Sequence, residues 1–127
     1  MVSQIWDNLR MVTIKHKEVV WIGSSLEDLK KFPESVKDEV GFALHRAQEG
    51  KKHHRAKPLK GFSGVFEIVS SFKSDTYRAV YGIKIGKKLY VLHTFKKKSK
   101  SGIKTPKPDL DLIKRRLKEA QRLEKEE

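Results

Sequence analysis

Three neighbouring stretches of the chain have the length and the apolar content expected of β-strands. The stretches cover 65–72, 76–85 and 88–95, and each is rich in β-branched and aromatic residues. Gly86-Lys87 between the last two fits a tight hairpin turn, because glycine tolerates positive φ. Strands joined by such short links must pair antiparallel. The pattern therefore predicts a small antiparallel sheet.

The last of these strands leads directly into a run of lysines. Strict alternation places Leu89, Val91, His93 and Phe95 on one face and Tyr90, Leu92, Thr94 and Lys96 on the other. From residue 93 to residue 107 there are six lysines and no acidic residue. The strand thus brings a histidine and a lysine cluster to its own end. The simpler interpretation is an edge strand that runs into a solvated basic loop.

Helical spacing of apolar residues flanks the predicted sheet on both sides. A short strand at 17–22 is followed by a helix that starts at Ser24, where Glu27 indicates a capping box. Thr105 followed by Pro106 predicts the start of a final helix. The helix predicted over 33–48 should end at Gly50 and bury one stripe. That stripe consists of Val36, Val40, Ala43, Leu44 and Ala47.

The order of elements predicts an α+β fold. A small antiparallel sheet is expected to pack against two N-terminal helices, with a C-terminal helix, and the helices should cover one face of the sheet. A length of 127 residues fits one domain over 1–127. Within it, 1–14 form an N-terminal extension and 123–127 a frayed tail.

Charge and composition narrow the classes of function. The formal net charge is +13, which favours RNA, DNA or an acidic protein as a partner. The absence of cysteine excludes disulfides, a thiol nucleophile and a thiolate metal site. No apolar run is long enough to span a bilayer, and no signal-peptide pattern is present. We therefore expect a cytoplasmic protein without a membrane partner.

Two charged residues are predicted near the centres of strands that are otherwise suited to burial. Arg78 lies within TYRAVYGI and Glu67 within VFEIV. Charges in such places are costly unless they are paired or face solvent. One interpretation is a cross-strand ion pair between them. The other is a sheet face left open for an anionic ligand, with Glu67 orienting Arg78, and the two are compatible.

Side chains suited to metal-free RNA cleavage gather in residues 53–104. Such cleavage needs a base for the ribose 2′-OH, cations for the phosphorane and an acid for the leaving oxygen. Histidine, lysine, arginine and tyrosine are all present there. The adjacent His53-His54 has no third ligand nearby in the sequence, so we predict no metal site and no cofactor.

Several segments resemble a known family. KPLKGFSGVFEI, TYRAVY and YVLHTFKKKSKSGIKTPKPDLDLIKRRLKEA resemble the phage-derived, HigB-like branch of the RelE/ParE toxin superfamily. The upstream VVWIGSSLEDLKKFPESVKDEVGFALHRAQEGK fits the same pattern. The resemblance covers residues 17–122, and its most specific part is LH-x-F-x-KKS…TP followed by a helix with RRL.

The resemblance implies a RelE-like fold and the toxin of a type II toxin–antitoxin system. It further implies a metal-independent, ribosome-dependent endoribonuclease, or mRNA interferase. The implied partners are mRNA, the ribosome and a cognate antitoxin, often a helix-turn-helix DNA-binding protein. Two other functions stay open: a ParE-like toxin that inhibits gyrase, and a non-catalytic module that binds RNA or the ribosome.

The candidate site residues follow from the basic and aromatic surface of that family. The expected catalytic residues are Arg78, His93, Lys96 and Lys97. We expect His93 to act as acid or base, and Arg78 with Lys96 or Lys97 to stabilise the phosphorane. If His93 is buried, the lysines and Arg78 must contribute more. The residues expected to bind RNA are Lys57, Lys60, Tyr81, Lys98, Lys100 and Lys104.

Overall fold

The computed structural model describes residues 16–97 and 104–126, so the predicted extension at 1–14 lies outside the described residues. The elements, in chain order, are β1 Val19–Trp21, α2 Ser25–Lys30, α3 Glu34–Gln48, β2 Ala56–Pro58, β3 Val65–Phe72, β4 Asp75–Ile85, β5 Lys88–Lys97 and α4 Lys107–Lys125. This order confirms the predicted α+β class. Among the described residues, no helix is both long enough and apolar enough to cross a membrane.

The strands form one mixed sheet in the order β1-β5-β4-β3-β2. The predicted antiparallel pairing of β3, β4 and β5 is confirmed. At one end β1 runs parallel to β5, with Val19 opposite Leu89. At the other end β2 pairs antiparallel with β3, with Ala56 opposite Ile68. Strand β2 was not predicted from the sequence, because it has only three residues and one of them is proline.

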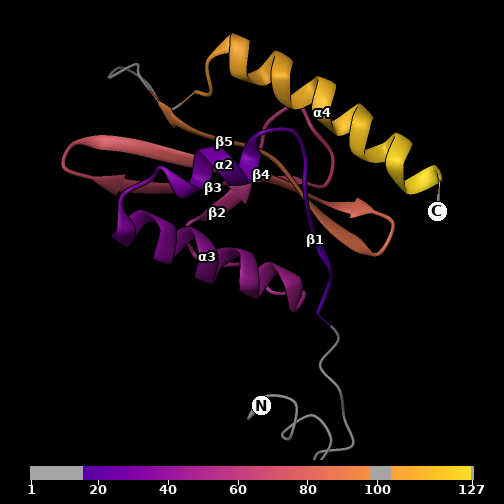
Figure 1. Cartoon of the computed structure of the whole chain (residues 1–127), viewed down its shortest axis with the longest axis horizontal. Coiled ribbons are helices and arrows are strands. Elements are labelled where there is room, and N and C mark those ends of the chain that lie inside the picture. Colours follow the sequence, from indigo (N-terminus) through magenta and orange to yellow (C-terminus); the bar gives the residue numbers. More distant parts are fainter. Residues whose placement is uncertain (1–15, 98–103, 127) are drawn as a thin grey trace, which may run out of the picture.

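Helices cover both faces of the sheet, which corrects the expectation of one covered face. Figure 1 shows α3 on one side of the sheet and α4 on the other. The core is accordingly divided into two clusters, one under α2 and α3 and one under α4. On β4, Ala79 belongs to the first cluster and Val80 to the second. A strand buried on both faces reads as a nearly continuous apolar run, so its sequence does not reveal which face is covered.

The predicted limits of α3 are confirmed, whereas the caps of its neighbours differ. The buried residues of α3 are those of the predicted stripe: Val36, Val40, Ala43, Leu44 and Ala47. Gly50 ends the helix at a φ of 80°. The prediction of a capping box at Ser24 is wrong. The Ser24 hydroxyl donates to the Asp28 carboxylate at 2.8 Å and does not cap α2.

A β-bulge in β5 changes which face His93 occupies. Val80 of β4 lies opposite His93, but Tyr81 lies opposite Val91, so Leu92 is the extra residue. The predicted strict alternation is therefore wrong, and His93 lies on the α4 face, away from Val91. From α4, Arg116 donates through Nη1 to the backbone carbonyl of Leu92 at 3.0 Å. This contact holds the bulge against α4.

We predict that truncation of the buried face of α4 destabilises the whole domain. Ile113 is fully buried in the cluster under α4. Ile113→Ala should lower the free energy of unfolding by about 2–5 kcal/mol through lost burial and the cavity left behind. Lys114→Ala, at the exposed next position, should change it by less than about 0.5 kcal/mol. Urea unfolding measures both, and equal stability of the two variants would contradict the packing of α4 on this face.

Candidate nucleic-acid interface

Arg78 and Glu67 form a buried ion pair beneath the α4 side of the sheet. Nη1 of Arg78 donates to Oε2 of Glu67 at 2.9 Å, and both side chains are 3% exposed. The hydroxyl of Thr105 donates to the same carboxylate oxygen at 2.6 Å and accepts from Arg78 at 3.2 Å. The cross-strand ion pair considered from the sequence is confirmed. The catalytic role of Arg78 stays a prediction, since its guanidinium is already engaged.

Thr105 therefore has a different role from the one predicted for it. The sequence indicated that its hydroxyl caps the last helix, but the N-cap of α4 is Pro106 and it makes no side-chain capping bond. Thr105 instead joins the segment leading into α4 to strands β3 and β4. The predicted position of the helix start is correct to within two residues.

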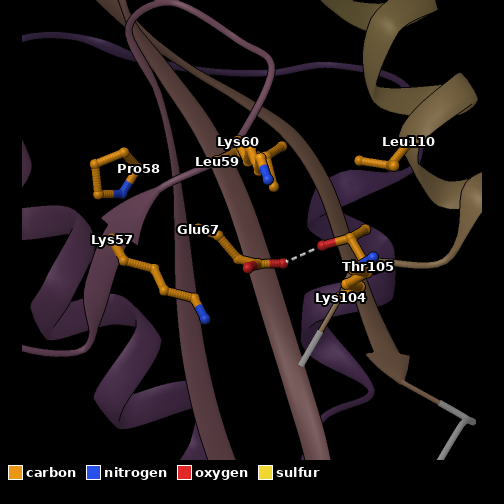
Figure 2. A pocket seen from close by; sticks show the side chains of 8 residues that line it. All are labelled: Lys57, Pro58, Leu59, Lys60, Glu67, Lys104, Thr105 and Leu110. Atoms are coloured by element: carbon orange, nitrogen blue, oxygen red, sulfur yellow. Dashed lines mark hydrogen bonds between the residues drawn. The ribbon is translucent and has the colours of Figure 1, made fainter. Parts of the chain in front are cut away.

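A basic pocket of about 530 Å³ opens over this ion pair. Figure 2 shows Glu67 near the centre of the pocket, with Lys57 on one side and Lys104 and Thr105 on the other. Its lining residues are Lys57, Pro58, Leu59, Lys60, Glu67, Lys104, Thr105 and Leu110. The structure thus brings together Lys57, Lys60 and Lys104, three of the residues predicted to bind RNA. All three side chains are exposed.

Lys97 is a buried lysine beside the same charges. It is 6% exposed, and burial lowers the pKa of its ammonium group below the usual value. The positive charges of Arg78 and Lys57 lower this pKa further, whereas Glu67 opposes them. Lys97 therefore releases its proton more readily than an ordinary surface lysine. This property suits a residue that exchanges a proton with a substrate.

His93 lies apart from the basic pocket. It lines a separate cleft of about 860 Å³ between α2 and the start of α4. The ring is 7% exposed and stacks on Phe95, and its Nε2 lies 2.7 Å from Oδ1 of Asp109. Burial lowers the pKa of His93, and Asp109 opposes that shift. Nδ1 is buried and has no hydrogen-bond partner among the residues that the structure describes. The predicted acid or base role stays a prediction and would need the ring to become accessible.

Lys96 lines the same cleft as His93 and points away from Lys97. Neighbouring strand residues face opposite sides of the sheet, so Lys96 shares the face of Tyr77, its partner on β4. Its ammonium group lies 3.1 Å from Asp75, and this carboxylate raises the pKa of Lys96. The two lysines considered as alternatives for stabilising the phosphorane therefore belong to different surfaces. The catalytic role of Lys96 stays a prediction.

Tyr81 is not available to RNA. It is 2% exposed in the core cluster under α3, where its ring stacks on Phe66. Burial raises the pKa of its phenol to about 12. Its assignment as an RNA-binding residue is corrected, because it packs on the face opposite Arg78. Lys98 and Lys100, also predicted to bind RNA, lie outside the described residues.

The basic pocket offers an environment for an anionic oxygen. Arg78 compensates the charge of Glu67, so that the lysines around the pocket retain an excess of positive charge. Leu110 and Pro58, the apolar parts of the wall, were not predicted as site residues, because they look like ordinary helix and loop residues. Charged donors around a partly apolar pocket can bind a phosphate and stabilise charge that develops on it.

Comparisons with known proteins identify a family and a similar solved structure. The model of the family described as "Phage derived protein Gp49-like (DUF891)" matches residues 27–118. No curated protein matches the chain. Among solved structures, the crystal structure of the isolated E. coli RelE toxin is similar, with 17% sequence identity and a TM-score of 0.49. That match covers 78% of this chain and 97% of the RelE chain.

We predict that Arg78 is required for stability. Arg78→Ala would leave Glu67 buried without its counter-ion and should lower the free energy of unfolding by about 3–5 kcal/mol. Lys57→Ala removes an exposed cation from the same pocket and should change stability by less than about 0.5 kcal/mol. Chemical unfolding followed by circular dichroism gives both values. The ion pair has no structural importance if the two variants unfold at the same denaturant concentration.

We also predict that His93 makes the fold less stable in acid. In the unfolded chain its pKa returns to about 6.5, whereas burial lowers it in the folded protein. The unfolded chain therefore binds more protons below about pH 6.5, so this contribution to stability is complete above that pH and falls as the pH drops. His93→Gln, which can still donate to Asp109, should lose less stability than the native chain between pH 7.5 and 5.5. Equal losses in urea titrations would refute the prediction.

Proposed function

The chain belongs to the phage-derived Gp49-like family, and on this basis we propose that it is the toxin of a type II toxin–antitoxin system. It acts in the cytoplasm as an endoribonuclease that cuts mRNA on the ribosome without a metal ion. The sequence motifs that resemble the HigB-like branch of the RelE/ParE toxins support this assignment. The observation that carries it is the basic pocket, in which lysines from separate segments surround a compensated carboxylate.

The scissile phosphate is proposed to bind in the basic pocket. Lys57 and Lys104 approach it from opposite walls, and both are exposed and free to adjust to a substrate. The ribose 2′-hydroxyl gives its proton to solvent and its oxygen attacks phosphorus, and the lysine charges stabilise the phosphorane that forms. Lys60 lines the same pocket and positions the RNA backbone next to the scissile phosphate. A pocket of this kind binds phosphate without reading the base.

Lys97 is proposed to supply the proton that the leaving 5′-oxygen takes up. Burial and the nearby positive charges of Arg78 and Lys57 lower its pKa. A lysine with a lowered pKa is a better acid at neutral pH than an exposed one. Arg78 and Glu67 contribute through their charges: Arg78 lowers the pKa of Lys97, and Glu67 raises it. His93 is not the first choice for this step, because it lines the separate cleft and not the basic pocket.

The same surface is the proposed target of the antitoxin. Its partner is a cognate antitoxin, of the helix-turn-helix DNA-binding type that the family resemblance implies. An acidic segment would match the charge of the basic pocket and would block RNA at the same time. The net charge of +13 also favours rapid, electrostatically steered association with such a segment.

Two other functions make different predictions for the cell. A ParE-like toxin would block DNA replication and leave mRNA intact. A non-catalytic module would bind ribosomes or RNA and leave both mRNA and replication intact. We favour the endoribonuclease because Lys97 is buried next to the pocket and has a lowered pKa. Simple phosphate binding does not need such a lysine.

We predict that the pocket lysines are needed for cleavage and not for folding. The double variant Lys57→Ala/Lys104→Ala should reduce mRNA cleavage on the order of 100-fold or more, because it removes two donors to the phosphorane. The matched control is Lys84→Ala/Lys87→Ala, which removes two exposed lysines at the opposite end of β5. Primer extension on mRNA after induction measures cleavage.

The outcomes separate the candidate functions. Discrete cleavage sites that vanish in the pocket variant and persist in the control support the proposal. Intact mRNA with arrested DNA replication would support the gyrase-directed function. Cleavage that is equal in the pocket variant and the control would place the active site elsewhere, and the separate cleft with His93 would then be the next candidate.

A further inference from the structure

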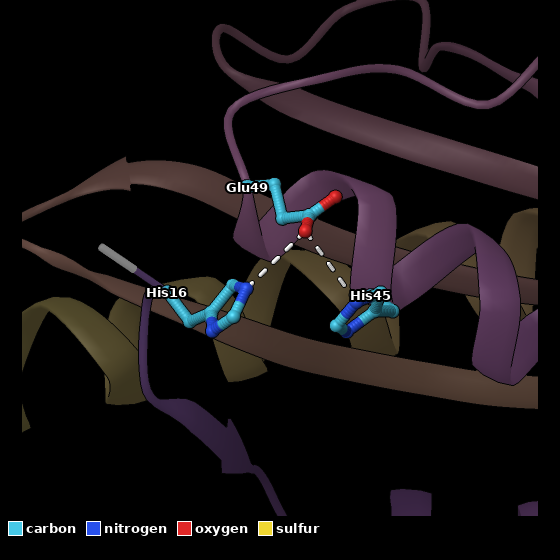
Figure 3. Close-up of side chains that lie close together, drawn as sticks. All are labelled: His16, His45 and Glu49. Atoms are coloured by element: carbon cyan, nitrogen blue, oxygen red, sulfur yellow. Dashed lines mark hydrogen bonds and ion pairs between the residues drawn. The ribbon is translucent and has the colours of Figure 1, made fainter. Parts of the chain in front are cut away.

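Three side chains that can bind a metal ion meet on the α3 side of the molecule. His45 lies in the last turn of α3, and Glu49 is the C-cap residue one turn further along. His16 comes from the segment that precedes β1. One ligand atom from each lies within 4.8 Å of the other two. Figure 3 shows both imidazole rings directed toward the Glu49 carboxylate. The sequence predicted no metal site because only His53-His54 was considered for one, whereas the residues that meet here are up to 33 positions apart in the chain.

Two of the three distances between ligand atoms are close to those around a four-coordinate transition metal. Oε2 of Glu49 lies 3.3 Å from Nε2 of His16 and 3.5 Å from Nε2 of His45. Ligand atoms about 2.0–2.1 Å from a tetrahedral Zn²⁺ are separated by roughly 3.3 Å. Two nitrogen ligands and one carboxylate oxygen leave the fourth position for water. Imidazole and carboxylate ligands together suit zinc better than magnesium or calcium.

Two hydrogen bonds hold the segment next to His16 in place before any metal binds. The amide of Lys17 donates to the carbonyl of Gln48 at 3.0 Å. In return, the side-chain amide of Gln48 donates to the carbonyl of Lys17 at 2.8 Å. This pair of hydrogen bonds fixes the chain next to His16 against the end of α3. A preformed arrangement costs less conformational entropy on binding than a loose one.

We propose that His16, His45 and Glu49 form a binding site for a divalent transition-metal ion of the zinc type. The metal would link the segment before β1 to the end of α3. The site shares no residue with the basic pocket, so its role is structural and separate from RNA cleavage. Bound metal would stabilise the folded chain by mass action, because the unfolded chain does not hold the three ligands together.

The competing explanation is a simple pair of histidine–carboxylate contacts. In that case each histidine binds Glu49 as a cation, and the arrangement needs no ion. The hydrogen bond from His16 lowers the pKa of Glu49, which keeps the carboxylate charged under either explanation. The two explanations differ in one respect: only the metal site requires both imidazoles to be neutral and to bind the same ion.

The test uses the full-length protein, prepared without a polyhistidine tag and titrated with Zn²⁺ at pH 7.5. Calorimetry should give one Zn²⁺ per chain, and Zn²⁺ should raise the melting temperature. His16→Asn and His45→Asn should each weaken binding by more than the roughly 10- to 100-fold that loss of a ligand's supporting partner costs. His54→Asn removes an exposed histidine elsewhere and should bind Zn²⁺ like the native chain.

Co²⁺ gives an independent readout of geometry. Its visible absorption should be that of a four-coordinate site in the native protein and should be lost in Glu49→Gln. The proposal is overturned if the native protein binds no Zn²⁺ under these conditions. It is equally overturned if His16→Asn and His45→Asn, with native circular dichroism, bind Zn²⁺ as tightly as the His54→Asn control does.

Discussion

The buried pairing of Arg78 with Glu67 is the constraint on which the α4 side of the molecule depends. Neither charge could remain buried alone, so β3 and β4 must keep the register that places them together. Thr105 extends the constraint to the segment leading into α4 through its bond to the same carboxylate oxygen. The positions of Lys104 and of the start of α4 therefore follow from one ion pair. The basic pocket opens on the surface directly over this ion pair.

Sequence patterns predicted those parts of the fold that depend on local periodicity. The stripe of α3 and the glycine that ends it, together with the hairpin between β4 and β5, follow from residue spacing alone. The parallel pairing of β1 with β5 could not be predicted in this way, since it joins distant segments. The bulge at Leu92 was equally hidden, because it depends on the contact with Arg116 of α4. It changed the predicted face of His93.

The candidate site was predictable as a set of residue types and less so as an arrangement. The lysine-rich segments indicated a polyanion partner, and the structure places Lys57, Lys60 and Lys104 around one pocket. Tyr81 was assigned to RNA because aromatic residues are common in such surfaces, yet strands also use them for packing. His93 and Lys97 lie on the same face of β5, but the histidine is enclosed by Phe95 and Asp109 and lines a different cleft. Such separations depend on tertiary packing and have no local signature.

The parallel pairing of β1 with β5 has a consequence for the order of events during synthesis. A chain made from its N-terminus exposes β1, α2 and α3 before their sheet partners exist, because β5 and β4 come later. The last wall of the basic pocket, at Lys104 and Thr105, is made later still. The basic pocket therefore cannot be complete before the segment that leads into α4 has been made, however much of the sheet has already formed.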